Sequence, residues 1–290
     1  MSTQNAPIHE ITITARSPLA VETSGTLGEA ADDTAAAQRI YAVGDLHGHL
    51  DLLKAMLRAI RADIDQHSDM PCTLVFLGDY IDRGPNSRGI LDLLSAGLSM
   101  DRCATVFLRG NHEQWLEDFV RGEPVLSDWA PKGGLQTLGS YGLSPELILK
   151  GCFDKTLESE IREQFLSVLP QAHRQFILDL GFFYSTSQYF FAHAGVDPDK
   201  GLEDQRSEDL TWIRYKFLRS QKDFGKVVVH GHTPAKAIES LPNRINVDTG
   251  VDMYGRLSCV ILEAGRRYGL EVFRERSIQA HAPVTERRAP

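Results

Sequence analysis

The chain has 290 residues, of which 42% are hydrophobic, and it carries a formal net charge of −8 at pH 7. This length and hydrophobic content are typical of a globular protein, and the negative charge argues against nucleic acid as the main partner, because phosphate backbones bind strongly basic surfaces. The N-terminus shows no secretory signal and no apolar run could span a bilayer, so we expect a cytoplasmic protein with no membrane partner.

The N-terminal part of the chain predicts an arm followed by a regular alternation of strands and helices. Residues 1–37 mix small, polar and acidic side chains with little periodicity, which predicts a flexible N-terminal arm. Ordered structure is expected over residues 38–278, with a polar tail at 279–290. Apolar runs at 40–43, 72–77 and 104–108 each end at a glycine and predict buried strands, and helical patterns follow at 48–61, at 86–98 and from residue 112.

The rest of the chain is less regular. Residues 122–170 are expected to form a helical insertion or lid of unassigned role. Strands are predicted at 181–185, 189–192, 226–229, 244–247, 257–262 and 270–273, with a helix at 210–218. Such alternation of strands and helices predicts an α/β protein with a central mixed β-sandwich flanked by helices.

Polar residues recur where the predicted strands end. The clusters are Gly44-Asp45-Leu46-His47-Gly48, Gly78-Asp79-Tyr80-Ile81-Asp82-Arg83-Gly84, Gly110-Asn111-His112-Glu113, Ala192-His193-Ala194-Gly195 and His230-Gly231-His232-Thr233-Pro234. Ligands gather outside the carboxyl ends of strands in open α/β sheets. Aspartate, asparagine and histidine supply the oxygen and nitrogen atoms that bind Mn²⁺, Fe or Zn²⁺, so we expect a metal site at this edge, where two ions could hold a nucleophilic hydroxide between them.

In this order, the motifs G-D-x-H-G, G-D-Y-x-D-R-G, G-N-H-E and G-H-T-P resemble the signature blocks of the phosphoprotein phosphatase branch of the calcineurin-like metallophosphoesterases. The resemblance extends from Tyr41 to about Gly250. It implies two divalent ions, with Mn²⁺ expected and Fe or Zn²⁺ as alternatives. The implied ligands are Asp45 and His47 for the first ion, Asp79 bridging both ions, and Asn111, His193 and His232 for the second.

The resemblance also implies catalytic roles. His112 would protonate the leaving group, and Asp82 would orient His112. Arg83, Arg109 and Arg214 would hold phosphate oxygens. The neighbouring Glu113 is expected to act as a charge at a helix N-terminus and not as a metal ligand.

The expected activity is hydrolysis of phosphate monoesters through attack by a metal-bridging hydroxide. The Asp82-Arg83 pair looks like that of the protein phosphatases and favours a bacterial-type serine/threonine protein phosphatase, acting on a phosphorylated protein or a small phosphoester. Three alternatives stay open: a diadenosine polyphosphate hydrolase of the same superfamily, a tyrosine or dual-specificity phosphatase, and a catalytically silent binding module.

Overall fold

The computed structural model of the protein describes residues 10–20, 38–100 and 102–274. Its strands are β1 (Ile11–Ile13), β2 (Ser17–Pro18), β3 (Arg39–Val43), β4 (Cys72–Phe76), β5 (Cys103–Phe107), β6 (Phe183–Ser185), β7 (Tyr189–Ala192), β8 (Val227–His230), β9 (Glu239–Ser240), β10 (Arg244–Asn246), β11 (Arg256–Glu263) and β12 (Arg266–Arg274). Its α-helices are α1 (Leu50–Gln66), α2 (Ser87–Ser95), α3 (Asn111–Arg121), α4 (Leu126–Trp129), α5 (Gly134–Ser140), α6 (Pro145–Gly151), α7 (Lys155–Val168), α8 (Gln171–Leu178), α9 (Ser207–Trp212), α10 (Tyr215–Leu218) and α11 (Val251–Tyr254). Short 3-10 helices span Ala130–Lys132 and Leu202–Asp204.

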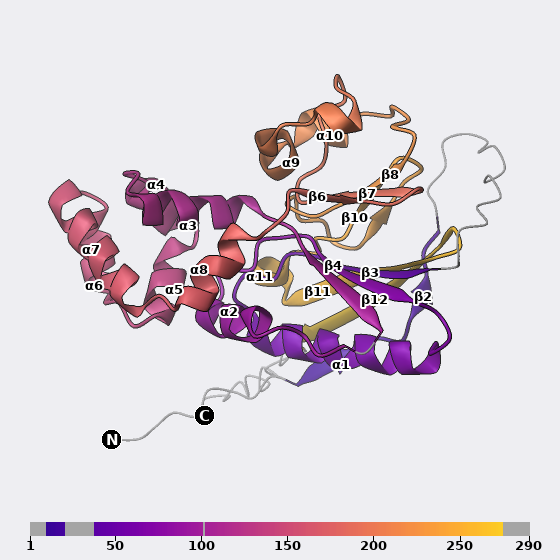
Figure 1. Ribbon diagram of the computed structural model, residues 1–290, viewed down its shortest axis with the longest axis horizontal. Coiled ribbons are helices and arrows are strands. Elements are labelled where there is room, and N and C mark those ends of the chain that lie inside the picture. The colour runs from indigo at the N-terminus through magenta and orange to yellow at the C-terminus, as the bar shows by residue number, and fades with distance from the viewer. Residues whose placement is uncertain (1–9, 21–37, 101, 275–290) are drawn as a thin grey trace, which may run out of the picture.

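The strands in these ranges form two sheets that pack face to face (Figure 1). The first sheet has the order β1-β12-β11-β3-β4-β5, with β2 also paired to β12, and the second has the order β6-β7-β8-β10-β9. Parallel pairs such as β3–β4 and β7–β8 occur beside antiparallel pairs such as β11–β3 and β6–β7. The predicted mixed sandwich is therefore confirmed.

The central strands are buried on both faces. Ile40 and Ala42 of β3 pack between the two sheets, whereas Tyr41 and Val43 pack toward the helices on the outer face of the first sheet. Successive side chains of a strand point to opposite faces, so a strand between two apolar layers must be apolar at every position. This explains why the predicted strands appear as continuous apolar runs.

Helices cover the outer faces and one end of the sandwich. In Figure 1, α1 lies beneath the first sheet, and α9 and α10 lie above the second, where Leu210 and Phe217 join the core of β7 and β8. The segment 122–170 folds into α4, a 3-10 turn, α5, α6 and α7, which stand with α3 and α8 beyond one end of the sheets. Among the described helices, none is at once long and apolar enough to cross a membrane.

Residues 10–20 differ from the predicted flexible arm, because they form β1 and β2 along the edge of β12. Ile11 pairs with Arg274, the Thr14 amide donates to the Glu271 carbonyl at 2.9 Å, and the Arg16 guanidinium lies 3.5 Å from the centre of the Tyr268 ring. An uncovered strand edge offers free backbone groups, which these short segments pair. The remainder of the predicted arm and the predicted tail at 279–290 lie outside the described residues.

The edge pairing predicts a stability contribution from residues 10–20. Deleting residues 1–20 is expected to lower the free energy of unfolding by about 2–3 kcal/mol relative to deleting residues 1–9, because several backbone hydrogen bonds to β12 are lost at about 1 kcal/mol each. Urea titrations of both truncated proteins measure this difference. Equal stability of the two proteins would show that β1 and β2 add nothing to the fold.

Candidate metal and catalytic site

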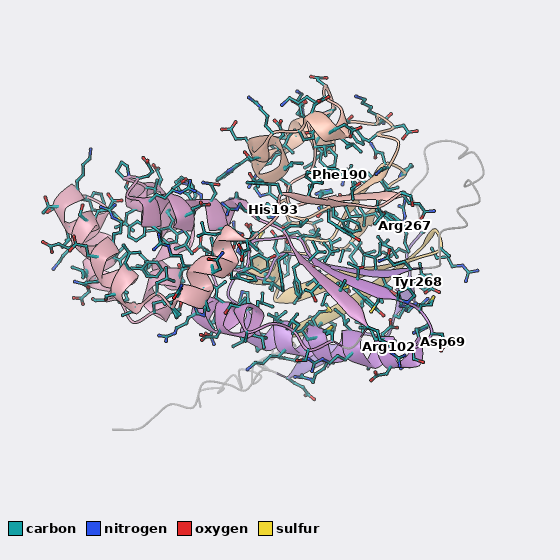
Figure 2. All side chains as sticks on the ribbon, viewed as in Figure 1. Asp69, Arg102, Phe190, His193, Arg267 and Tyr268 are labelled. Carbon is teal, nitrogen blue, oxygen red and sulfur yellow. The ribbon has the colours of Figure 1, made fainter. Side chains whose placement is uncertain are left out.

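The predicted ligands come from loops that follow β3, β4, β5, β7 and β8, at the end of the sandwich that adjoins the helical region. Figure 2 shows His193 at this end, and Asp69 and Arg102, which precede β4 and β5, at the opposite end. The parallel strands β3, β4 and β5 therefore deliver their carboxyl-terminal loops to the same place. This is the position at which open α/β sheets bind ligands.

These loops hold an unusual backbone. Among the described residues, seven residues other than glycine have a left-handed backbone φ. Five of them lie in the motif loops, with φ between 39° and 72°: His47, Asp79, Asp82, Arg83 and His232. Such conformations cost of order 1–3 kcal/mol each and persist only where the surrounding contacts fix them. Their concentration here indicates a backbone that is held for a function.

Asp79 lies at the centre of the cluster. One of its oxygens, Oδ2, is 3.6 Å from His47 Nε2 and 3.8 Å from His112 Nε2, while the other, Oδ1, is 3.4 Å from His193 Nε2. The Asp79 carboxylate belongs to two groups of possible metal-binding atoms. One group contains His47 and His112, and the other contains His193 and His232. Within each group the atoms lie within 4.8 Å of one another. Asp79 is thus the one member common to both groups.

The remaining predicted ligands complete the same cluster. Asn111 Oδ1 is 3.1 Å and His232 Nδ1 is 3.2 Å from His193 Nε2. The Asp45 carboxylate accepts the backbone N–H of His232 at 3.2 Å, and its Oδ2 lies 4.0 Å from His47 Nε2. The structure therefore brings all six side chains that were predicted as metal ligands into one cluster.

Second hydrogen bonds orient the imidazole rings. His47 Nδ1 lies 3.0 Å from the Ile81 carbonyl oxygen and His193 Nδ1 lies 3.0 Å from the Leu77 carbonyl oxygen. A carbonyl can only accept, so each Nδ1 carries the proton and each Nε2 directs a lone pair at the Asp79 region. Metal-binding histidines are typically held by such a bond from the other ring nitrogen.

The electrostatics of the cluster suit a divalent cation. Burial lowers the pKa of His47 and His193, and it lowers the pKa of His232 to about 2, so these rings are neutral, as metal ligands must be. Burial, followed by the nearby Asp248 and Asp79 carboxylates, raises the pKa of Asp45. A bound cation relieves this crowding of carboxylates, and carboxylate, amide and imidazole donors fit Mn²⁺, Fe or Zn²⁺.

Glu113 holds the loops and takes no place among the ligands. Its buried carboxylate accepts backbone N–H groups from Asp79 at 3.0 Å, from Tyr80 at 2.8 Å and from Gly110 at 2.9 Å. The last of these bonds caps the N-terminus of α3, in agreement with the predicted helix-terminal role. One side chain therefore joins the loop after β4 to the loop after β5.

His112 and Asp82 form a hydrogen-bonded pair beside the cluster. His112 Nδ1 lies 2.6 Å from Asp82 Oδ2. The same carboxylate accepts Trp129 Nε1–H at 2.7 Å and the Thr137 hydroxyl at 2.5 Å. Burial lowers the pKa of His112, but the Asp79 and Asp82 carboxylates outweigh burial and the net shift is upward, which favours the imidazolium form.

Trp129 and Thr137 are functional candidates that the motifs did not reveal. Both are fully buried, and they come from α4 and α5 of the 122–170 segment, about 50 residues after Asp82 in the chain. Neither residue lies in a recognisable pattern, so nothing in the sequence indicates the contact. The insertion of unassigned role thus supports the His112–Asp82 pair directly.

Two of the three predicted phosphate-binding arginines reach the cluster. Arg83 Nη2 lies 3.2 Å from His112 Nε2, and Arg214 Nε donates to His232 Nε2 at 2.9 Å. The helix predicted over 210–218 is broken into α9 and α10 at Ile213 and Arg214, where both residues leave the helical conformation. This break separates Arg214 from the two helices and leaves its side chain bonded to His232.

Arg109 does not reach the cluster, so its predicted role in holding phosphate is corrected. Its guanidinium forms an ion pair with Glu117 and donates to the Ile177 carbonyl at 2.7 Å. Arg109 and Glu117 are both buried, and buried charges are costly unless they are paired. In this protein Arg109 joins α3 to α8.

A cleft of about 660 Å³ opens beside the cluster. It is lined by residues from several motifs and from the helical segment: Arg83, Asn111, His112, Ala130, Pro131, Lys132, Gly133, Leu135, Gln136, Trp212, Arg214 and Asp252. Arg83, Lys132 and Arg214 bring positive charge to this lining, and Asp252 is its one acidic side chain. The cleft can therefore receive an anion next to His112.

Residues 38–256 match the family described as calcineurin-like phosphoesterase. A protein of Anoxybacillus flavithermus named bis(5'-nucleosyl)-tetraphosphatase PrpE (asymmetrical) is 26% identical over 239 residues, covering 75% of this chain and 88% of its own. The crystal structure of a candidate diadenosine tetraphosphatase has a TM-score of 0.51 at 20% identity, over 82% of this chain and 94% of that one. A cold-active protein tyrosine phosphatase has a TM-score of 0.51 at 16% identity, over 80% and 75%. Both structural likenesses establish the fold alone.

The Trp129–Asp82 bond predicts a catalytic effect. Trp129→Phe keeps the buried ring but removes one of three hydrogen bonds to the carboxylate, so kcat is expected to fall about tenfold, because hydrogen bonds to charged groups are the strong ones. Steady-state kinetics with p-nitrophenyl phosphate and Mn²⁺ measure this effect. Tyr141→Phe is the matched control, since it removes the bond to His173 in the same helical region and makes no contact with Asp82. Equal kcat values for both variants would contradict a role for Trp129.

Proposed function

Because the chain belongs to the calcineurin-like phosphoesterase family, we propose that it is a metal-dependent hydrolase of dinucleoside tetraphosphates. The observation that carries this proposal is the cleft beside Asn111 and His112, which has room for much more than one phosphate group and has cations along its walls. The similarity to proteins named bis(5'-nucleosyl)-tetraphosphatase supports the same substrate class.

Two divalent ions would be held around Asp79. The first would contact Asp45 and His47, the second would contact Asn111, His193 and His232, and the Asp79 carboxylate would be shared, in accordance with its position between the two groups. When bound, such ions supply positive charge to the phosphoryl oxygens and lower the pKa of a water molecule that attacks phosphorus.

The chain's own residues complete the reaction. Water adds to one phosphorus of the tetraphosphate, and the bond from that phosphorus to the bridging oxygen breaks. His112, whose Nδ1–H donates to the Asp82 carboxylate, would give the proton at Nε2 to the departing oxygen. Arg83 and Arg214 flank this position and would hold the non-bridging oxygens through their guanidinium groups. Unequal division of the tetraphosphate yields a nucleoside monophosphate and a nucleoside triphosphate.

Serine/threonine protein phosphatase activity is the second candidate. It is favoured by the adjacent Asp82 and Arg83, which resemble the corresponding pair in protein phosphatases. The relatives found by sequence favour the dinucleotide substrate, and the structural neighbours are too distant in sequence to support either.

A direct comparison of substrates tests the proposal. With Mn²⁺, kcat/KM for diadenosine tetraphosphate is expected to exceed that for a phosphoserine peptide by about a hundredfold, because only the dinucleotide can use the whole cleft. Product analysis is expected to give AMP and ATP in equal amounts. A preference for the phosphopeptide would replace the proposed function with the second candidate.

Asp79 provides a test of the shared ligand. Asp79→Asn removes a carboxylate charge at the centre of the cluster and is expected to lower kcat/KM by about a thousandfold, since metal ions supply several kcal/mol of transition-state stabilisation. Asp69→Asn is the matched control, because Asp69 is exposed at the opposite end of the sheets (Figure 2). Activity of Asp79→Asn near that of the control would contradict the assignment.

A further inference from the structure

One wall of the cleft has a composition that the hydrolytic step does not require. Trp212 ends α9 and lines the cleft together with Lys132, which ends the 3-10 helix after α4. Trp115 of α3 lies behind them, with its ring centre 6.0 Å from that of Trp212 at an angle of 81° and 4.8 Å from Lys132 Nζ. We call these three side chains the tryptophan–lysine wall.

The wall presents an aromatic ring to solvent in the cleft. Trp212 is 37% exposed although it is a large apolar side chain, and its position is fixed by edge contacts with Trp115 and with His232, whose ring centre is 6.2 Å away. The indole N–H of Trp115 is buried and has no hydrogen-bond partner among the described residues. An exposed aromatic ring that is held in place by its neighbours can stack against a flat ligand.

Backbone connections link the wall to both phosphate-binding arginines. Lys132 directly precedes Gly133, whose carbonyl accepts the backbone N–H of Arg83 at 3.4 Å. Trp212 stands two residues before Arg214, which bonds to His232. The same four side chains line one cleft, so a chain of phosphates that begins between Arg83 and Arg214 has Lys132 and Trp212 along the same walls.

We propose that the tryptophan–lysine wall binds the nucleoside and distal phosphates of the substrate, a proposal that rests on the proposed function. The nucleobase stacks on the exposed ring of Trp212, and Lys132 contacts phosphates beyond the one that reacts. Stacking on an aromatic side chain accepts any base, so the site selects a nucleotide as a class. Lysine serves as a point charge for phosphate and needs no fixed geometry. The cleft volume of about 660 Å³ falls within the usual range for small-ligand sites.

Competitive inhibition of p-nitrophenyl phosphate hydrolysis separates base from phosphate recognition. The inhibitors are ATP and tripolyphosphate, which share three phosphates and differ in the nucleoside, with Mn²⁺ kept in excess of both. Trp212→Leu is expected to raise the inhibition constant of ATP about tenfold and that of tripolyphosphate less than about twofold. Lys132→Met is expected to raise both constants about fivefold.

Two variants of the helical segment serve as matched controls. Phe153→Leu alters an aromatic side chain that is 93% exposed, and Lys155→Met removes an exposed lysine, and neither residue lines the cleft. Both are expected to keep the wild-type inhibition constants for ATP and tripolyphosphate. Trp212→Phe is expected to keep the ATP constant within about threefold, because a phenyl ring still stacks on a base.

The possible outcomes distinguish this inference from the proposed function. If Trp212→Leu shifts neither constant, or shifts both equally, the nucleoside site is refuted even if the wild-type protein cleaves diadenosine tetraphosphate. If the wild-type protein does not cleave the dinucleotide but ATP inhibition depends on Trp212, the nucleoside site stands and the proposed function falls.

Discussion

The active end of this protein depends on a buried carboxylate that must be surrounded by compensating groups. Asp79 is only 2% exposed and faces the rings of His47, His112 and His193. Burial by itself would raise the pKa of Asp79, but the surrounding histidines, among them His112 in its imidazolium form, outweigh burial and the pKa is lowered. The carboxylate stays charged only because loops from several strands converge on it, so the sandwich and the site are parts of one arrangement.

Glycines at two positions allow the loops to pack this closely. A Cβ atom at Gly110 would collide with the Asp79 carboxylate, and one at Gly231 would collide with Asp45. Glu113 then ties the loop after β4 to the start of α3 through three backbone N–H groups. The glycines of the motifs are therefore needed for approach of the backbone to the ligands, and the acid beside them is needed for support.

The clustering of the candidate metal ligands could be predicted from the sequence because each of them lies within a few residues of the end of a strand, whereas their assignment as ligands came from the resemblance of the motifs. Contacts made at long range could not be predicted. Trp129 and Thr137 support Asp82 from a segment that has no motif, and the ion pair with Glu117 removes Arg109 from the cleft. The strands β1 and β2 are only three and two residues long, too short for a recognisable alternation.

The metal content of the protein tests most directly whether two ions share Asp79. The purified protein would be stripped of metal, loaded with Mn²⁺, passed over a desalting column and measured by inductively coupled plasma mass spectrometry against protein concentration. Two manganese ions per chain are expected. One ion per chain would contradict the shared position of Asp79, and none would contradict the assignment of the cluster as a metal site.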